Sequence, residues 1–165
     1  AHTVETDSAA PFVVVDKGGK ILNVLDADLR NPVQFRFGSD EVDSIGDAYS
    51  SMDRKWLAIT DSRRNILWVS TVNGSRPAPS AHRGTLLGFA QNQAVVLSED
   101  GTSLSRVQPA TDAVTSTLSF SRPLAGGLKV ILQAVDPTGN RVVLKDLKDG
   151  RIWIANFLTP KTRVE

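Results

Sequence analysis

Four segments of this 165-residue sequence repeat one arrangement: an apolar run, a short polar turn and a second apolar run. They are "FVVVDKGGKILNVLDA" at 12–27, "KWLAITDSRRNILWVSTVNG" at 55–74, "AVVLSEDGTSLSRV" at 94–107 and "LQAVDPTGNRVVLKDL" at 132–147. The turns centre near Gly18, Arg63, Gly101 and Thr138, so successive turns lie 45, 38 and 37 residues apart. This spacing predicts a series of β-hairpins, one about every forty residues.

The residues within these segments favour strands over helices. The apolar runs are rich in β-branched and aromatic residues, and Asp61 is placed to bond the amides of the turn that follows it. Asp outnumbers Glu by 14 to 4; because Asp favours turns and Glu favours helices, we expect little helix. Residues 40–51 are predicted to form a loop that leads into a strand near Ala48. Further strands are predicted at 33–37, 85–90, 113–120 and 151–157.

Three of the strands that leave a turn are "GKILNVLDA" (19–27), "NILWVSTVNG" (65–74) and "GRIWIANF" (150–157). They are similar to strands of the β-propeller class, whose blades are four-stranded antiparallel sheets of about 40–45 residues. The units look most like quinoprotein-type and WD-repeat blades. The chain lacks the Gly-His and Trp-Asp dipeptides of WD repeats and any recognisable quinoprotein cofactor set. The resemblance therefore implies an architecture and no particular activity.

The length allows about four such blades, so we predict an all-β fold, a small or partial β-propeller, with a β-sandwich as the alternative. The propeller-like domain is expected at 12–158, after a flexible segment at 1–11 and before a tail at 159–165. An incomplete propeller leaves its end strands, near 12–15 and 152–157, in need of cover from each other or from another chain. The predicted core comprises Val14, Ile59, Leu67, Val69, Val96, Val143, Ile152 and Ile154.

The catalytic groups in this sequence are few. It contains no cysteine and only two histidines, His2 and His82, which excludes a cysteine nucleophile and thiolate-bound zinc. His82 lies in the Pro- and Ser-rich stretch 75–84, which is predicted to be an exposed loop. The Gly-x-Ser-x-Gly elbow that holds the nucleophilic serine of α/β-hydrolases does not occur in the sequence. We therefore assign no catalytic residue and no cofactor.

Two acidic clusters raise the question of calcium, which prefers several oxygen ligands together. "DADLR" holds Asp26 and Asp28, and "GSDEVDSIGD" (38–47) holds Asp40, Glu41, Asp43 and Asp47. The second cluster lacks the central glycine and the terminal glutamate of a calcium-binding loop. An acidic surface loop is the favoured interpretation, and no metal-binding residue is assigned.

The charges are nearly balanced, with 19 basic and 18 acidic residues and a net charge of +1. The densest basic neighbourhood, with Trp56 and Trp68 near it in sequence, is formed by Arg54, Lys55, Arg63, Arg64 and Arg76. A nucleic-acid patch is one interpretation. A solvated hairpin tip above core tryptophans is the favoured one, and nucleic acid is not the predicted partner.

The favoured function is a non-enzymatic binding or assembly module, the extracytoplasmic part of a larger membrane-associated transport, secretion or sensor protein. Its partner would be a protein, or a second copy that associates through blade edges. A small-molecule or ion-sensing domain and a propeller hydrolase or quinoprotein-like enzyme are the alternatives. No stretch approaches the roughly 20 apolar residues of a spanning helix, so this segment is not expected to insert into a membrane. A periplasmic or secreted location is predicted, with the cytoplasm as the alternative.

Overall fold

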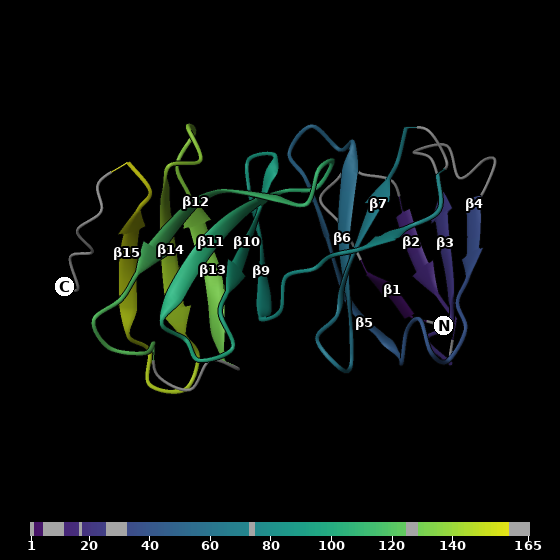
Figure 1. The fold of residues 1–165 in the computed structure, drawn as a ribbon, viewed down its shortest axis with the longest axis horizontal. Coiled ribbons are helices and arrows are strands. Elements are labelled where there is room, and N and C mark those ends of the chain that lie inside the picture. Colours follow the sequence, from purple (N-terminus) through teal and green to yellow (C-terminus); the bar gives the residue numbers. More distant parts are fainter. Residues whose placement is uncertain are drawn as a thin grey trace. The chain divides into compact units, whose positions relative to one another are not determined.

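The computed structural model describes residues 2–4, 12–16, 18–25, 33–72, 75–124 and 129–158. Within these ranges the chain forms only strands and turns, arranged as four antiparallel sheets (Figure 1). Sheet 1 contains β1 (His2–Val4), β2 (Phe12–Val15), β3 (Ile21–Leu25) and β4 (Val33–Arg36). Sheet 2 contains β5 (Ile45–Ser50), β6 (Trp56–Asp61), β7 (Ile66–Ser70) and β8 (Ala78–Pro79).

Sheet 3 contains β9 (Thr85–Ala90), β10 (Gln93–Leu97), β11 (Ser103–Gln108) and β12 (Ala113–Ser119). Sheet 4 contains β13 (Val130–Val135), β14 (Arg141–Asp146) and β15 (Ile152–Asn156). Within each sheet, every strand pairs with its neighbours in sequence, so each sheet is a simple meander. Four separate meanders are the arrangement of propeller blades rather than of the two packed sheets of a β-sandwich. The predicted all-β, blade-like fold is confirmed.

The four sheets divide into two units, residues 1–82 and 83–165, and each unit has its own apolar core. In the first unit, side chains of sheets 1 and 2 pack together, including Leu22, Phe35, Leu57 and Ile59. In the second unit, side chains of sheets 3 and 4 do the same, including Leu97, Leu104, Leu144 and Trp153. β9 and β13, the first described strands of sheets 3 and 4, lie next to each other. Each unit is therefore held together by the apolar core between its two sheets.

The boundary of the first sheet differs from the predicted domain limit. β1 pairs with β2 in antiparallel register, with His2 opposite Val15 and Val4 opposite Val13. Sheet 1 therefore begins within the stretch 1–11. β2 lies between β1 and β3 and is an interior strand, whereas the sequence placed it at an uncovered end of the propeller. The loop predicted before Ala48 is shorter than expected, because β5 already begins at Ile45.

One turn geometry recurs at the four predicted hairpins. The first turn residue is Asp16, Asp61, Ser98 or Asp136, and its carbonyl accepts the backbone N–H of the residue three positions later at 2.9–3.0 Å. The donating residues are Gly19, Arg64, Gly101 and Gly139, and their φ angles are positive, at 67°, 64°, 70° and 72°. Three of the four are glycines, for which this left-handed conformation carries no steric cost. The turn residues thus explain why all four hairpins were visible in the sequence.

The fourth hairpin, however, holds a different position in its sheet from the other three. The turns at Asp16, Asp61 and Ser98 each join the second and third strands of a sheet. The turn at Asp136 joins β13 to β14, the first and second described strands of sheet 4. The equivalent turn in sheet 4 is the one after Asp146, which leads through Gly150 into β15. The 37-residue spacing between the third and fourth turns therefore does not measure one blade, because the same turn type occurs at two different places in a blade.

The predicted core is half right. Ile59, Leu67, Val69 and Val96 are buried, and the side chain of Val14 lies outside the described residues. Ile152 and Ile154 are 49% and 45% exposed, while Trp153 and Ala155 between and after them are 5% and 0% exposed. Successive residues of a strand point to opposite faces of the sheet. The prediction that Ile152 and Ile154 are core residues took the exposed face of β15 for the buried one and is therefore wrong.

The same error affects β14. Val143 is only half-buried, and its neighbours Val142 and Leu144 are fully buried. In the sequence "RVVLKD" both faces carry apolar residues, so the alternation that would identify the core face is absent.

The pKa of Asp100, in the turn between β10 and β11, predicts a loss of stability in acid. Hydrogen bonds from Ser98 and Thr102 lower the pKa of Asp100 from 3.8 to about 2. A folded-state pKa below the unfolded value stabilises the fold above about pH 4, and this contribution is lost as pH falls towards 2. We expect urea unfolding midpoints to decrease across this window. Asp100→Asn should show a shallower decrease, and an unchanged pH profile in that variant would contradict the assignment.

Candidate functional site

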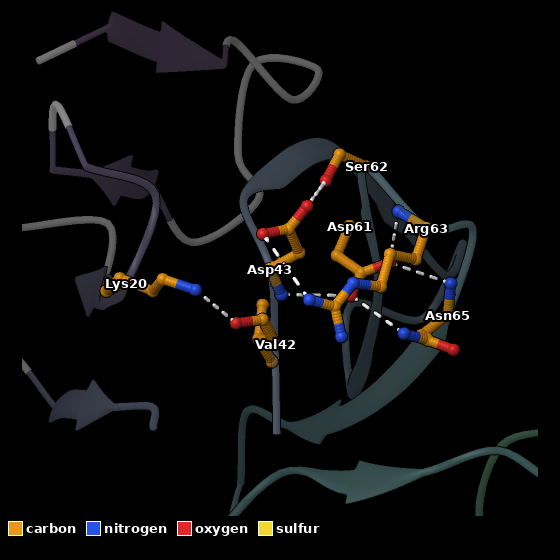
Figure 2. Close-up of polar contacts among 7 residues, drawn as sticks. All are labelled: Lys20, Val42, Asp43, Asp61, Ser62, Arg63 and Asn65. Carbon is orange, nitrogen blue, oxygen red and sulfur yellow. Dashed lines mark hydrogen bonds and ion pairs between the residues drawn. The ribbon is translucent and has the colours of Figure 1, made fainter. Parts of the chain in front are cut away.

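A polar cluster lies at the turn between β6 and β7 and consists of Asp43, Asp61, Ser62, Arg63 and Asn65 (Figure 2). Asp61 ends β6 and is only 6% exposed. Its carboxylate accepts the backbone N–H groups of Arg63 and Asn65 at 3.0 and 2.8 Å. It also accepts the side-chain amide of Asn65 at 2.8 Å and the N–H of Asp43 at 3.2 Å. Asp61 thus organises both its own turn and the segment before β5.

The outer part of the polar cluster is held by Asp43. Its carboxylate accepts a hydrogen bond from the Ser62 hydroxyl and lies 3.8 Å from the Arg63 guanidinium. The Ser62 N–H donates to the Ser44 carbonyl at 2.8 Å. The Arg63 and Asp43 side chains are 58% and 46% exposed, so their ion pair adds little to stability.

Sheet 1 joins the polar cluster through the turn between β2 and β3. The Gly19 carbonyl accepts the N–H of Ile45 at 3.1 Å, and the Lys20 ammonium donates to the Val42 carbonyl (Figure 2). A Cβ atom at Gly19 would lie 2.8 Å from the Ile45 nitrogen. The close approach of the two sheets at this point therefore requires glycine.

The polar cluster is built to hold a carboxylate in its charged form. Burial raises the pKa of Asp61, but the hydrogen bonds from Asn65, Asp43 and Arg63 outweigh it and hold the pKa below 3.8. A general acid or base that works near neutral pH needs a pKa near that value. The arrangement is suited to holding the β6–β7 turn against the segment that leads into β5, rather than to proton transfer.

The residues of the predicted acidic loop go to separate partners. Glu41 accepts the N–H of Gly38 at 2.8 Å and pairs with Arg76, whereas Asp43 belongs to the polar cluster. In the described ranges, no three His, Asp or Glu side chains gather closely enough to hold a metal ion. Asp26 and Asp28 lie outside the described residues.

The two histidines belong to other segments of the chain than the polar cluster. His82 lies in the connection between β8 and β9 and is half-buried, and the predicted exposed loop at 75–84 includes the short strand β8. Its backbone N–H donates to the Ser80 hydroxyl at 3.1 Å. His2 lies on β1, and its side chain is outside what the structure describes.

The basic neighbourhood does not form a single patch. Arg54 and Lys55 precede β6, whereas Arg63 and Arg64 follow it. Since β6 spans six residues, the two pairs lie at strand ends about 20 Å apart. Trp68 is 2% exposed and belongs to the interior, whereas Trp56 is only half-buried. This geometry supports the interpretation as hairpin tips above a core tryptophan.

A second cluster, which the sequence analysis did not single out, centres on Arg106 of β11. Its guanidinium donates to the Ser116 hydroxyl at 2.7 Å, and to the Gly139 carbonyl and the Asn140 side chain at 3.0 Å each. It also lies 4.5 Å from the ring centroid of Phe157. Arg106 therefore ties sheet 3 to one end of sheet 4, where the Phe157 N–H donates to the Asn140 carbonyl at 2.8 Å. The available signal was an arginine in the middle of the strand "SLSRVQ".

We expect Arg106→Ala to lower the free energy of unfolding by about 2–3 kcal/mol, since it removes charge-assisted hydrogen bonds and a cation–π contact. Arg106→Lys should recover less than half of this loss, because an ammonium cannot reproduce the forked hydrogen bonds of a guanidinium. Urea unfolding measures both values. Equal stability of the lysine variant and the unmodified protein would contradict the role of the fork.

The remaining candidate is a surface on sheet 4. Five of the nine large apolar side chains that are exposed in the described residues belong to this sheet and its turns: Ile131, Leu147, Ile152, Ile154 and Leu158. Exposed apolar side chains gathered on one element mark interaction surfaces more often than isolated ones do. Ile152 and Ile154 are core residues in the prediction from sequence, so that prediction contains no such surface.

Solved structures with a similar fold support the blade interpretation. AztD from Citrobacter koseri matches with a TM-score of 0.66 and 12% identity, covering 98% of this chain and 44% of that protein. BamB from Moraxella catarrhalis matches with a TM-score of 0.61 and 14% identity, covering 98% of this chain and 49% of that protein. Both are β-propeller proteins. No protein-family model and no curated protein matches the sequence.

The fold and the similar structures together place this chain in the β-propeller class. The chain spans about half the length of the proteins it matches. At these identities the likeness concerns the fold alone. No helix able to span a bilayer occurs in the part of the chain that the structure describes.

Proposed function

We propose that this protein is a non-enzymatic binding or assembly module that holds a protein partner against the exposed surface of sheet 4. The observation that carries the proposal is the exposure of Ile152 and Ile154, at 49% and 45%, on the same face of one strand. Burying apolar surface on a partner releases about 25 cal/mol per Å² of area. Such a surface is therefore a source of binding free energy that the described part of the chain does not use.

We further propose that the module is the extracytoplasmic part of a larger membrane-associated transport, secretion or sensor protein. AztD and BamB are periplasmic or extracellular proteins, which is the compartment that the sequence analysis predicts. Because their likeness to this chain concerns the fold, the compartment and the larger assembly stay predictions. Fractionation of the source cells, with immunodetection of the native protein, tests the compartment.

Photo-crosslinking tests the binding function. A photoreactive amino acid at position 154 should capture a protein in the source cells, because this side chain lies within the proposed contact. Val114 of β12 is a matched control, since it is a strand residue with 44% exposure against 45% for Ile154. Equal capture at positions 154 and 114 would overturn the proposal.

A further inference from the structure

β15 lies at the end of sheet 4, and in the described part of the chain no strand pairs with its far side. Sheets 1, 2 and 3 each have a fourth strand at the corresponding position, namely β4, β8 and β12. The correspondence follows from the turns, because the turn after Asp146 joins the second and third strands of sheet 4, as the turn after Ser98 does in sheet 3. Sheet 4 therefore has an open position for a fourth strand, next to β15.

The hydrogen bonds between β14 and β15 show which backbone groups of β15 are turned to this open edge. The Asp146 N–H donates to the Arg151 carbonyl at 2.9 Å, and the Phe157 N–H donates to the Asn140 carbonyl at 2.8 Å. Bonded and non-bonded pairs alternate along an antiparallel ladder, so the odd-numbered residues from 151 to 157 bond to β14. The even-numbered residues, whose N–H and C=O groups point to the open edge, are Ile152, Ile154 and Asn156.

The edge of β15 has the properties of an edge that pairs. Unpaired strand edges attract other strands, and folded proteins cover such edges or interrupt them. β8, the outer strand of sheet 2, has only two residues and ends at Pro79, which has no N–H to donate. β15, with the sequence "IWIAN", contains neither proline nor a charged residue, and its pairing with β14 has no bulge. The edge is therefore suited to taking a further strand.

The sequence that follows β15 has the length and the pattern of a returning strand. In sheet 3 the third and fourth strands are joined by the four residues 109–112, with Gln108 opposite Ala113. The same connection after Asn156 would place the next strand at 161–165, "KTRVE". Thr and Val favour strands, and they alternate there with Lys, Arg and Glu. This alternation is typical of a strand with one buried face.

The alternation also matches the two faces of β15. In the register equivalent to that of sheet 3, Val164 is opposite Trp153, which is 5% exposed, and Arg163 is opposite Ile154, which is 45% exposed. β12 follows the same rule, because Leu118 is its one buried side chain and packs in the core that sheets 3 and 4 share. A register of the opposite phase would turn Arg163 to the core and Val164 to water, at a cost in free energy.

We propose that residues 161–165 form the fourth strand of sheet 4, antiparallel to β15, with Val164 on the core side and its charged neighbours on the outer side. This strand closes the edge of β15 and leaves the side chains of Ile152 and Ile154 exposed on the outer face of the sheet. A protein partner can then contact that face but cannot add a strand to β15. The inference goes beyond the proposed function and does not rest on it, because it concerns the edge of the sheet.

Residue-resolved amide hydrogen exchange tests the proposal. In the unmodified protein we expect the N–H groups of Ile152 and Ile154, which point to the edge, to exchange at least about a hundred-fold more slowly than in an unstructured peptide. The N–H groups of Trp153 and Ala155 bond to β14 and are the internal reference. Protection of the reference pair alone would overturn the proposal. Protection of the edge pair that appears only as the protein concentration rises would overturn it in favour of a second copy at the edge.

Two variants with the same introduced residue distinguish the two sides of the strand. Val164→Asp places a charge on the core side, so the N–H groups of Ile152 and Ile154 should exchange at least about ten-fold faster than in the unmodified protein. Arg163→Asp places the charge on the outer side and should change these rates by less than about three-fold. Equal effects of the two variants would overturn the proposed strand.

Because the protein contains no cysteine, a pair of introduced thiols reports the same contact without a destabilised variant. Cα atoms of paired strand residues are about 4.5–5.5 Å apart, a separation that a disulfide spans. On mild oxidation, Ile154→Cys with Arg163→Cys should form an intramolecular disulfide at least about ten-fold faster than Ile154→Cys with Thr162→Cys, in which the second thiol is on the opposite face. Equal rates of disulfide formation in the two double variants would overturn the proposal.

Discussion

Replacing Trp153 with alanine is expected to lower the free energy of unfolding by about 3–5 kcal/mol, one of the largest effects of any single substitution in this protein. Trp153 is 5% exposed and packs in the core that sheets 3 and 4 share. Its loss removes a large apolar side chain and leaves a cavity between the two sheets. Urea unfolding followed by circular dichroism measures the change, since removing a tryptophan alters the fluorescence.

Ile152→Ala is the matched control for Trp153→Ala, because the two residues are adjacent in β15 and point to opposite faces. We expect a loss below about 1 kcal/mol for a side chain that is already 49% exposed. Comparable losses for the two substitutions would show that the core face of β15 has been assigned to the wrong side.

Asp61→Ala is expected to lower the free energy of unfolding by about 2–4 kcal/mol. Its carboxylate accepts four hydrogen bonds at the end of β6, from Asp43, Arg63 and Asn65. Truncation leaves these donors without their acceptor at a position that is only 6% exposed, and each buried donor left unsatisfied costs about 1–3 kcal/mol. The expected loss is smaller than the sum of the costs of these donors because the exposed part of the turn can bind water.

Asp40→Ala is the control for this substitution, because Asp40 is exposed and lies outside the polar cluster. We expect a change within about 0.5 kcal/mol. Asp61→Asn should fall between the two, since an amide keeps one acceptor oxygen for the turn. A loss for Asp61→Ala no greater than that for Asp40→Ala would contradict the role of Asp61 in holding the turn.

The fold class could be read from the sequence because its signals are local. The turn residues set the backbone geometry, as at Gly19 and Gly101, where a positive φ is needed. The β-branched and aromatic runs on either side then leave strands as the consistent choice. A strand and its turn span fewer than twenty residues, so no distant contact is needed to identify them.

The position of the fourth hairpin within its blade could not be predicted from such local signals. The turn after Asp136 and the turn after Ser98 share one geometry, although they join different pairs of strands. Turn chemistry fixes a local backbone conformation and carries no information on whether a strand precedes the hairpin. Only the pairing of β13 with β14, and the position of β13 beside β9, reveal the order.

The sequence by itself determined an all-β chain of repeated hairpins with turns at named residues. The tertiary structure alone decided which face of β14 and β15 is buried, that Asp61 holds its turn against the segment before β5, that Arg106 ties sheet 3 to sheet 4, and that the outer face of sheet 4 is left exposed. The physical reason is that propensity and turn chemistry act between residues near in sequence. Burial and cross-sheet hydrogen bonds depend instead on which sheets lie against each other. In "RVVLKD" and "IWIAN" both faces are apolar, so the sequence pattern is the same whichever face the neighbouring sheet covers.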